Sequence, residues 1–142
     1  MNKKRGYWGI AFHEPKFGEN IGTAIRSANC FGANFICIIG KRYKKQPTDT
    51  MATKNHVPIY EYKDFSDFLE HIPIDCEIIG IEVDGRDIKN FIHPERAIYI
   101  FGGEDRILPK EIKNRLSINT SYCLNMAVAA SIVMFHRNYA NK

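Results

Sequence analysis

Residues 7–39, with the sequence YWGIAFHEPKFGENIGTAIRSANCFGANFICII, predict a strand, a helix and a second strand. The first strand, Tyr7–Phe12, ends before Pro15, because proline cannot continue the hydrogen bonding of a central strand. In the helix, Asn20–Phe31, apolar residues recur at helical spacing and a glycine follows. The second strand, Phe35–Ile39, is apolar throughout, which is typical of a sheet covered on both faces.

The rest of the chain continues this alternation. Further strands are predicted at Val57–Tyr62, Glu77–Val83 and Ala97–Phe101, a brief strand or turn at Ser117–Asn119, and helices at Asp64–Ile72, Leu108–Arg115 and Leu124–Tyr139. Alternating strands and helices predict an α/β fold, a mostly parallel sheet flanked by helices. Ligands of such sheets bind beyond the carboxyl ends of the strands, so polar residues there are the candidate site.

Composition sets limits on the class of protein. The 142 residues are 44% hydrophobic and 25% charged, which is typical of a globular protein of one domain. Lys and Arg number 20 against 16 Asp and Glu, and this net charge of +4 is compatible with nucleic acid. No apolar run reaches the roughly 18–20 residues of a membrane helix, and the N-terminus lacks the apolar core of a secretory signal. Four cysteines without a Cys-x-x-Cys pair predict reduced, buried thiols in a cytoplasmic protein.

The first polar cluster, Glu19–Ala28, opens the helix that follows the first strand. Asn20 suits the helix N-cap, and the free N–H groups behind it form a natural anion site. Arg26 lies about one and two-thirds turns further on, so only its length would bring it back to Asn20. The alternative is a plain capping residue beside a solvated arginine.

The second cluster, Gly102-Gly103-Glu104-Asp105, follows the Ala97–Phe101 strand. Paired glycines at the end of a strand let backbone amides line a pocket, where Glu104 would accept hydrogen bonds or hold an arginine. The alternative is a tight turn with an exposed acid.

The third cluster, Thr120–Ala127, enters the last predicted helix. That helix is apolar nearly all the way round from Met126 to Phe135, so it needs cover on most faces, and polar groups at a buried start need partners. The alternatives are capping by Ser121 or Asn125 with Cys123 filling core space, or Cys123 as a nucleophile activated by the helix N-terminus.

In this order, the three clusters resemble the motifs of the TrmH-like (SpoU) branch of the SPOUT RNA methyltransferases. The matching residues are Asn20, Arg26, Ala28 and Gly32, then Gly102-Gly103-Glu104, then Cys123-Leu124-Asn125 with Ala127, Ala129 and Ala130. The resemblance runs from about residue 7 to residue 140. The chain departs from the pattern in Asp105 and Ile107, where glycines are usual, in Cys123, where serine is usual, and in Ile118-Asn119, where Ile-Pro is usual.

The resemblance implies a methyltransferase that uses S-adenosylmethionine to methylate a ribose 2′-hydroxyl, in tRNA first and in rRNA second. It implies a single SPOUT domain over residues 1–142 without an appended RNA-binding domain, a C-terminal trefoil knot, and a homodimer with its active sites at the interface. No metal is implied. The implied catalytic residues are Arg26, Asn20, Glu104, Asn125 and Cys123, and the implied cofactor-binding residues are Ile81, Glu82, Gly102, Ile118, Leu124 and Met126.

In this interpretation Arg26 stabilises the developing alkoxide and holds a phosphate, Asn20 orients Arg26 or Glu104, and Asn125 helps to close the site. Two basic segments are expected to contact RNA phosphates, with Lys3, Lys4 and Arg5 in one and Lys41, Arg42, Lys44 and Lys45 in the other. The alternative is that both segments are merely solvated.

Two other functions stay open. The departures at Cys123 and in the glycine-rich loop are compatible with a SPOUT-fold protein that binds RNA or cofactor without catalysis. A doubly wound nucleotide- or phosphate-binding module would use residues 20–26 to hold an anion, but the chain contains neither a Gly-x-Gly-x-x-Gly motif nor a P-loop.

Overall fold

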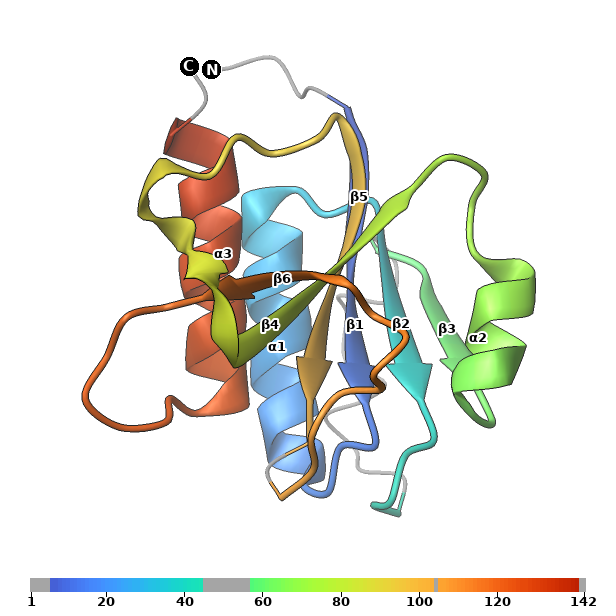
Figure 1. Ribbon diagram of the computed structural model, residues 1–142. Helices are drawn as coiled ribbons and strands as arrows, with labels where there is room; N and C mark the ends of the chain where they lie inside the picture. The colour runs from blue at the N-terminus through green and yellow to red at the C-terminus, as the bar shows by residue number, and fades with distance from the viewer. Residues whose placement is uncertain (1–5, 45–56, 104, 141–142) are drawn as a thin grey trace.

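The computed structural model describes residues 6–44, 57–103 and 105–140 of the chain. Six strands, all parallel, form one sheet in the order β3-β2-β1-β5-β4-β6 (Figure 1). The elements are β1 (Tyr7–His13), α1 (Gly18–Phe31), β2 (Phe35–Ile39), β3 (Ile59–Tyr62), α2 (Phe65–His71), β4 (Glu77–Asp87), the 3-10 helix η3 (Ile88–Asn90), β5 (Arg96–Gly102), β6 (Asn114–Ser117) and α3 (Met126–Ala140). The predicted α/β class with a parallel sheet is confirmed.

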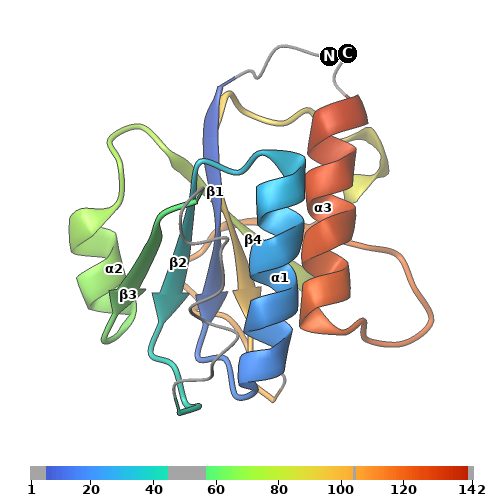
Figure 2. The same cartoon turned by 180° about the vertical axis from the view of Figure 1, so that it is seen from behind.

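Helices cover both faces of the sheet. Helices α1 and α3 lie side by side on one face, whereas α2 packs beside β3 on the other (Figures 1 and 2). The alternation of side chains along the central strands divides the core accordingly: Phe12 and Phe101 face α1 and α3 with ring centroids 5.7 Å apart, and Ala11 and Ile100 face the opposite way. No helix in the described ranges is long and apolar enough to cross a bilayer.

At the far edge of the sheet, β4 crosses β6. Leu116 of β6 pairs with Ile81 and again with Arg86, because the register of β4 is broken between these two residues. The crossing brings two backbones together at Gly85, where an added Cβ would lie 2.4 Å from the carbonyl carbon of Leu116. Only glycine fits at this position. Gly85 therefore lies directly against the backbone of β6.

Two local predictions are wrong. Residues 108–115 do not form a helix. A single turn, closed by the hydrogen bond from the N–H of Ile112 to the carbonyl of Pro109, is enough to bury Leu108 and Ile112, and residues 114–115 already belong to β6. Asn20 does not cap α1, which begins two residues earlier, at Gly18, after an N-cap at Phe17.

The expectation of four buried thiols needs correction. Only Cys37 is a buried thiol, because Cys30 and Cys123 lie on the surface and Cys76 is half-buried; all four are free. Helix α3 buries a single face within the chain, and the apolar side chains of its other faces are exposed, among them Val128, Phe135 and Tyr139.

Candidate active site

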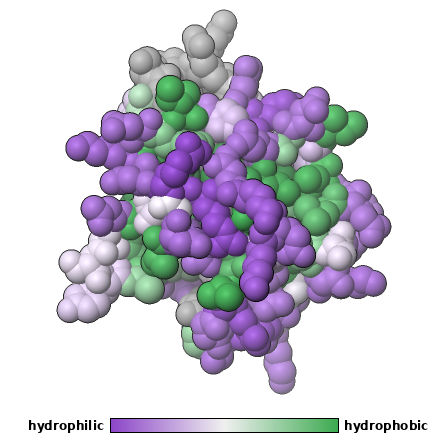
Figure 3. Space-filling model, in the orientation of Figure 1, coloured by the Kyte–Doolittle hydropathy of each residue, from purple (hydrophilic) through white to green (hydrophobic). Residues whose placement is uncertain are grey.

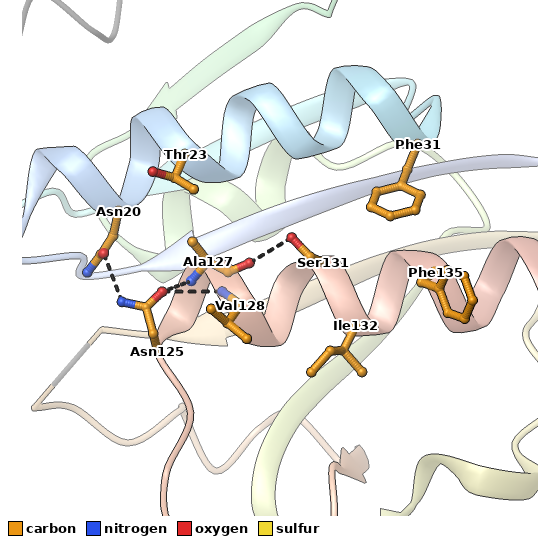
Figure 4. Close-up of a pocket in the computed structure, with 9 residues that line it drawn as sticks. All are labelled: Asn20, Thr23, Phe31, Asn125, Ala127, Val128, Ser131, Ile132 and Phe135. Carbon is orange, nitrogen blue, oxygen red and sulfur yellow. Dashed lines mark hydrogen bonds between the residues drawn. The ribbon is translucent and has the colours of Figure 1, made fainter.

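A pair of asparagines joins the first and third polar clusters. Asn125 precedes α3, and its Oδ1 accepts hydrogen bonds from the N–H groups of Ala127 at 2.9 Å and Val128 at 3.2 Å. Its Nδ2 donates to Oδ1 of Asn20, in the first turn of α1, at 3.0 Å (Figure 4). Because two backbone donors occupy the oxygen of Asn125, its nitrogen must face Asn20. The capping role considered for Asn125 is confirmed.

This pair closes one end of a groove between α1 and α3. The groove has a volume of about 520 Å³ and is lined by Asn20, Thr23, Phe31, Asn125, Ala127, Val128, Ser131, Ile132 and Phe135. Figure 4 shows the amides at one end and the rings of Phe31 and Phe135 at the other. Ser131 donates to Ser27 at 3.0 Å and so links the two helices. The groove is polar at the asparagine end and apolar along most of its length.

Arg26 is exposed on α1 and makes no hydrogen bond or ion pair with any described residue, Asn20 included. It lies eight residues beyond the start of α1, which is about 12 Å along the helix axis. The structure therefore does not bring Arg26 and Asn20 together.

The glycine-rich loop after β5 lies against the end of β1. Gly102 pairs with His13, and the N–H of Gly103 donates to the carbonyl oxygen of His13 at 2.7 Å. A Cβ on Gly103 would lie 2.2 Å from the carbonyl oxygen of Glu14, so the loop needs glycine there. Glu104 lies outside the described residues.

The residues predicted to bind the cofactor come from neighbouring strands and from the start of α3. Ile81 pairs with Phe101 on one side and with Leu116 on the other, so the three strands meet beside it. Glu82 accepts a hydrogen bond of 2.9 Å from the N–H of Leu108, which ties β4 to the loop after β5. Gly102 is the last residue of β5, and Ile118 comes directly after β6. Around the start of α3, Leu124 is exposed and Met126 is buried. None of the six lines the groove of Figure 4, which Asn20 and Asn125 do line.

The basic side chains at positions 41, 42 and 44, which the structure describes, differ in their contacts. Lys41 forms an ion pair with Glu61 at 3.3 Å. Arg42 donates to the carbonyl of Glu14 at 2.9 Å and to Asp105 at 2.5 Å. Lys44 is exposed. The remaining predicted phosphate contacts, Lys3, Lys4, Arg5 and Lys45, lie outside the described residues.

Arg42 was predicted as a phosphate contact, but its contact with Asp105 and the place of His13 in the site were not predicted. His13 is 8% exposed at the end of β1, and its Nδ1 has no hydrogen-bond partner among the described residues. Burial lowers the pKa of His13, and Arg106 and Arg42 lower it further although Glu14 opposes them. The hydrogen bond from Arg42 lowers the pKa of Asp105. The 63 positions between Arg42 and Asp105 leave no local pattern that would reveal their contact.

Cys123 is exposed, which contradicts the alternative that it fills core space. Within the described ranges, no three His, Cys, Asp or Glu side chains gather in a way that would hold a metal ion. Fold and site together define a parallel α/β protein whose candidate binding loops lie at the carboxyl edge of the sheet, with an asparagine pair joining two of its helices.

The chain belongs to the SpoU rRNA Methylase family, whose model matches residues 8–135. The resemblance to TrmH-like (SpoU) RNA methyltransferases is therefore confirmed, and S-adenosylmethionine is the expected cofactor. No curated protein matches the sequence significantly.

Solved structures share the fold. One, described as giving structural insights into the 2-OH methylation of C/U34 on tRNA, is 21% identical, with a TM-score of 0.82 over 98% of this chain and 92% of that chain. The SpoU methyltransferase AviRb from Streptomyces viridochromogenes, in complex with AdoMet, is 18% identical, with a TM-score of 0.80 over 95% of this chain and 60% of that chain. An AdoMet-bound rRNA methyltransferase from Sinorhizobium meliloti is 22% identical, with a TM-score of 0.80 over 98% of this chain and 59% of that chain. The chain thus spans about three fifths of the length of the last two proteins.

Proposed function

We propose that the chain methylates a ribose 2′-hydroxyl of RNA with S-adenosylmethionine as methyl donor, with tRNA as the first candidate substrate and rRNA as the second. The observation that carries the proposal is the 3.0 Å hydrogen bond between Asn20 and Asn125, which joins the first and third motifs in one place. The similar structure concerned with 2-OH methylation on tRNA supports this choice of hydroxyl and of RNA.

The residues assigned to the cofactor fit an adenosine group. Exposed apolar side chains lie in the same segments of the chain: Val83 in β4 is 79% exposed, Ile107 in the loop after β5 is 79% exposed, and Leu124 before α3 is 36% exposed. Such side chains suit the apolar faces of an adenine, and the backbone of Gly102 would meet its polar edge. Ile81, Glu82, Gly102, Ile118, Leu124 and Met126 would hold the cofactor, which when bound supplies an electrophilic methyl group on its sulfonium.

Arg26 supplies a fixed positive charge. An arginine keeps its proton at any physiological pH, since its pKa exceeds roughly 12, so we assign Arg26 no role as a base. Its guanidinium stabilises the negative charge that develops on the ribose oxygen and binds a neighbouring phosphate through paired donors. Holding the hydroxyl in line with the methyl group supplies a further part of the rate enhancement.

We propose further that a second copy of the chain covers the groove between α1 and α3 and that each active site uses residues of both copies. The exposed Val128, Phe135 and Tyr139 give α3 an apolar surface along this groove. The opposite face of the molecule, where β4 and β6 lie in front, is largely hydrophilic (Figure 3). Arg26, which is exposed and has no hydrogen-bond partner among the described residues, would then act in the site of the other copy.

The chain crossing at β6 supports the proposal of a C-terminal trefoil knot. Leu116 pairs with both Ile81 and Arg86, so β4 bends where it meets β6, and a chain that threads a knot at its C-terminal part would need such a close crossing. A location in the cytoplasm stays a prediction.

Two measurements test the function. Isothermal titration with S-adenosylmethionine measures cofactor binding, and transfer of a radiolabelled methyl group to total tRNA or rRNA measures activity. Alkali-resistant dinucleotides in the digested product identify methylation of the ribose. Binding without transfer to either RNA would favour the non-catalytic alternative, and an absence of binding would contradict the proposed function.

A further inference from the structure

Arg42 connects the loops that follow β1, β2 and β5. Arg42 lies in the loop after β2, and its backbone N–H donates to the carbonyl of Pro15 at 2.9 Å. Its Nε donates to the carbonyl of Glu14 at 2.9 Å, and its Nη2 donates to Oδ1 of Asp105 at 2.5 Å. The side chain is only 22% exposed although it lies on a loop. Most of the side chain is therefore covered by the loops that it joins.

The guanidinium also lies against Gly103, on the other side of position 104. A Cβ built on Gly103 would lie 2.9 Å from Nη2 of Arg42. The N–H of Gly103 is already bonded to the carbonyl of His13 at 2.7 Å. Arg42 thus contacts the residues that precede and follow position 104, and both contacts hold the loop against the end of β1.

The end of β1 has a backbone conformation that needs such support. Glu14 has a φ of 52°, in the left-handed region that a residue other than glycine seldom adopts, at a cost of about 1 kcal/mol or more. Its N–H donates to the carbonyl of Ile39 at 2.7 Å, and its own carbonyl accepts from Arg42. The bonds on both sides of Glu14 keep its carbonyl turned toward the guanidinium.

Asp105 lies among three cations, since Nε of Arg106, at 3.9 Å from its Oδ1, joins Arg42 and Lys16 around it. Lys16 lies 3.7 Å from Oδ2 of Asp105, and Arg106 lies 3.5 Å from the carboxylate of Glu14. Asp105 stands where the resembling family usually has glycine, so this chain has a carboxylate partner for Arg42 that the usual motif does not provide. A cation engaged by Asp105 and a carbonyl has few donors left for a phosphate.

We propose that Arg42 is a positioning residue of the active site rather than an RNA contact. Through Asp105 and the carbonyl of Glu14, it holds the loop after β5 in the shape in which Gly102 lines the cofactor site. The inference rests on the proposed function, because that function assigns this loop to the cofactor.

The test compares Arg42→Gln, Arg42→Lys and Asp105→Asn with Lys110→Gln, which changes an exposed lysine outside these contacts. Hydrogen exchange of the amides of residues 102–107 is measured first, without cofactor. We expect exchange about tenfold faster in the first three variants, since each loses a hydrogen bond between charged groups, and unchanged exchange in Lys110→Gln. Arg42→Lys separates geometry from charge. Lysine keeps the positive charge, but its single nitrogen cannot donate to the carbonyl of Glu14 and to Asp105 in the way that Nε and Nη2 of arginine do.

Binding measurements then separate the two roles of Arg42. A positioning role predicts cofactor affinity about tenfold weaker, with the KM for RNA and its salt dependence within twofold of the wild type. A weaker and less salt-dependent RNA interaction, with unchanged exchange and unchanged cofactor affinity, would show that Arg42 binds phosphate and would overturn the proposal. If the wild-type protein binds no S-adenosylmethionine, the proposed function fails, and the exchange rates still decide whether Arg42 holds the loop.

Discussion

The side-chain amide of Asn125 donates a hydrogen bond of 3.0 Å to the amide oxygen of Asn20, 105 positions earlier in the chain. The same amide caps α3 through its oxygen, so one side chain both starts the last helix and ties it to the first. This contact places α1 and α3 side by side at the end of the groove (Figure 4).

Asn125→Ala should lower the free energy of unfolding by about 1–2 kcal/mol, because two backbone N–H groups of α3 lose their acceptor. Asn125→Asp is the matched control, since a carboxylate still accepts from both N–H groups and the amide of Asn20 can turn to donate to it. Urea denaturation of both variants measures the difference. Equal losses in the two would mean that the cap is not the main contribution of Asn125.

Gly85→Ala should cost at least about 3 kcal/mol or prevent folding, because the added methyl group meets the backbone of β6 at 2.4 Å. Gly80→Ala, on the same strand, puts its methyl group 3.0 Å from the ends of the Ile112 and Leu108 side chains, which can shift. We expect that control to cost about 1 kcal/mol or less. Soluble yield and denaturation midpoints compare the two, and a well-folded Gly85→Ala protein would contradict the close crossing of β4 and β6.

A chain of hydrogen bonds fixes the charge state of His93. Arg137 can only donate to the hydroxyl of Tyr99, at 2.9 Å, so that hydroxyl donates to Nδ1 of His93 at 2.6 Å. Nε2 of His93 then donates to Nδ1 of His136 at 2.7 Å, and His136 donates to the carbonyl of Lys89 at 3.2 Å. Every member is satisfied only while both histidines are neutral.

The unfolding free energy should therefore fall as the pH is lowered from about 6.5 toward 3. Burial, with His136 and Arg137 nearby, lowers the pKa of His93 from 6.5 to about 3, so the unfolded chain takes up the proton first as the pH falls. The slope for one such group approaches about 1.4 kcal/mol per pH unit in that range. Urea denaturation at several pH values measures it. His93→Phe should reduce the slope without abolishing it, because buried His13 acts in the same direction, and an unchanged slope would exclude His93 as the source.

Phe135→Glu should convert the proposed dimer into a monomer, because Phe135, 55% exposed at the end of the groove, would bring a charge into an apolar interface. Ile92→Glu introduces the same charge at a residue that is 82% exposed and outside the groove, and it should leave the dimer intact. Sedimentation equilibrium gives the mass of each protein. A monomeric wild type, or a dimeric Phe135→Glu protein, would contradict the proposed interface.

Arg26→Ala should lower kcat for methyl transfer by at least about a hundredfold, because the developing alkoxide loses its cation. Cofactor affinity should stay within about threefold, since Arg26 is exposed and no residue of its own cofactor site contacts it. Single-turnover transfer and isothermal titration measure the two quantities. Full activity of the variant would remove Arg26 from the mechanism.

The strands and helix starts that depend on neighbouring residues were predicted correctly from the sequence. The apolar runs at Tyr7–Phe12 and Phe35–Ile39 became β1 and β2, because a continuous apolar run is most stable inside a sheet covered on both faces. Asp64 was placed at the start of a helix, and its carboxylate accepts from the N–H of Asp67 at 2.8 Å. The three motifs identified the family because each is a short stretch of neighbouring residues.

Where distant contacts compete with local preference, the prediction was wrong. Pro109 suits the first turn of a helix, yet no helix follows it. Residues 114–117 instead pair with β4 as an edge strand of the sheet, because this pairing buries Leu116 completely. Asn20 suits an N-cap, but its oxygen accepts from Asn125 while α1 begins at Gly18.

The sequence by itself determined the α/β class, the order of most strands and helices and the family, because periodicity and short motifs act over a few residues. Tertiary structure alone decided that Asn20 meets Asn125, that Arg42 meets Asp105 and that β4 crosses β6 at Gly85. Each of these contacts joins residues that are far apart along the chain. Such contacts form only when the packing of the whole sheet and its helices brings the chain segments within hydrogen-bonding distance or van der Waals contact, and no local pattern records that packing.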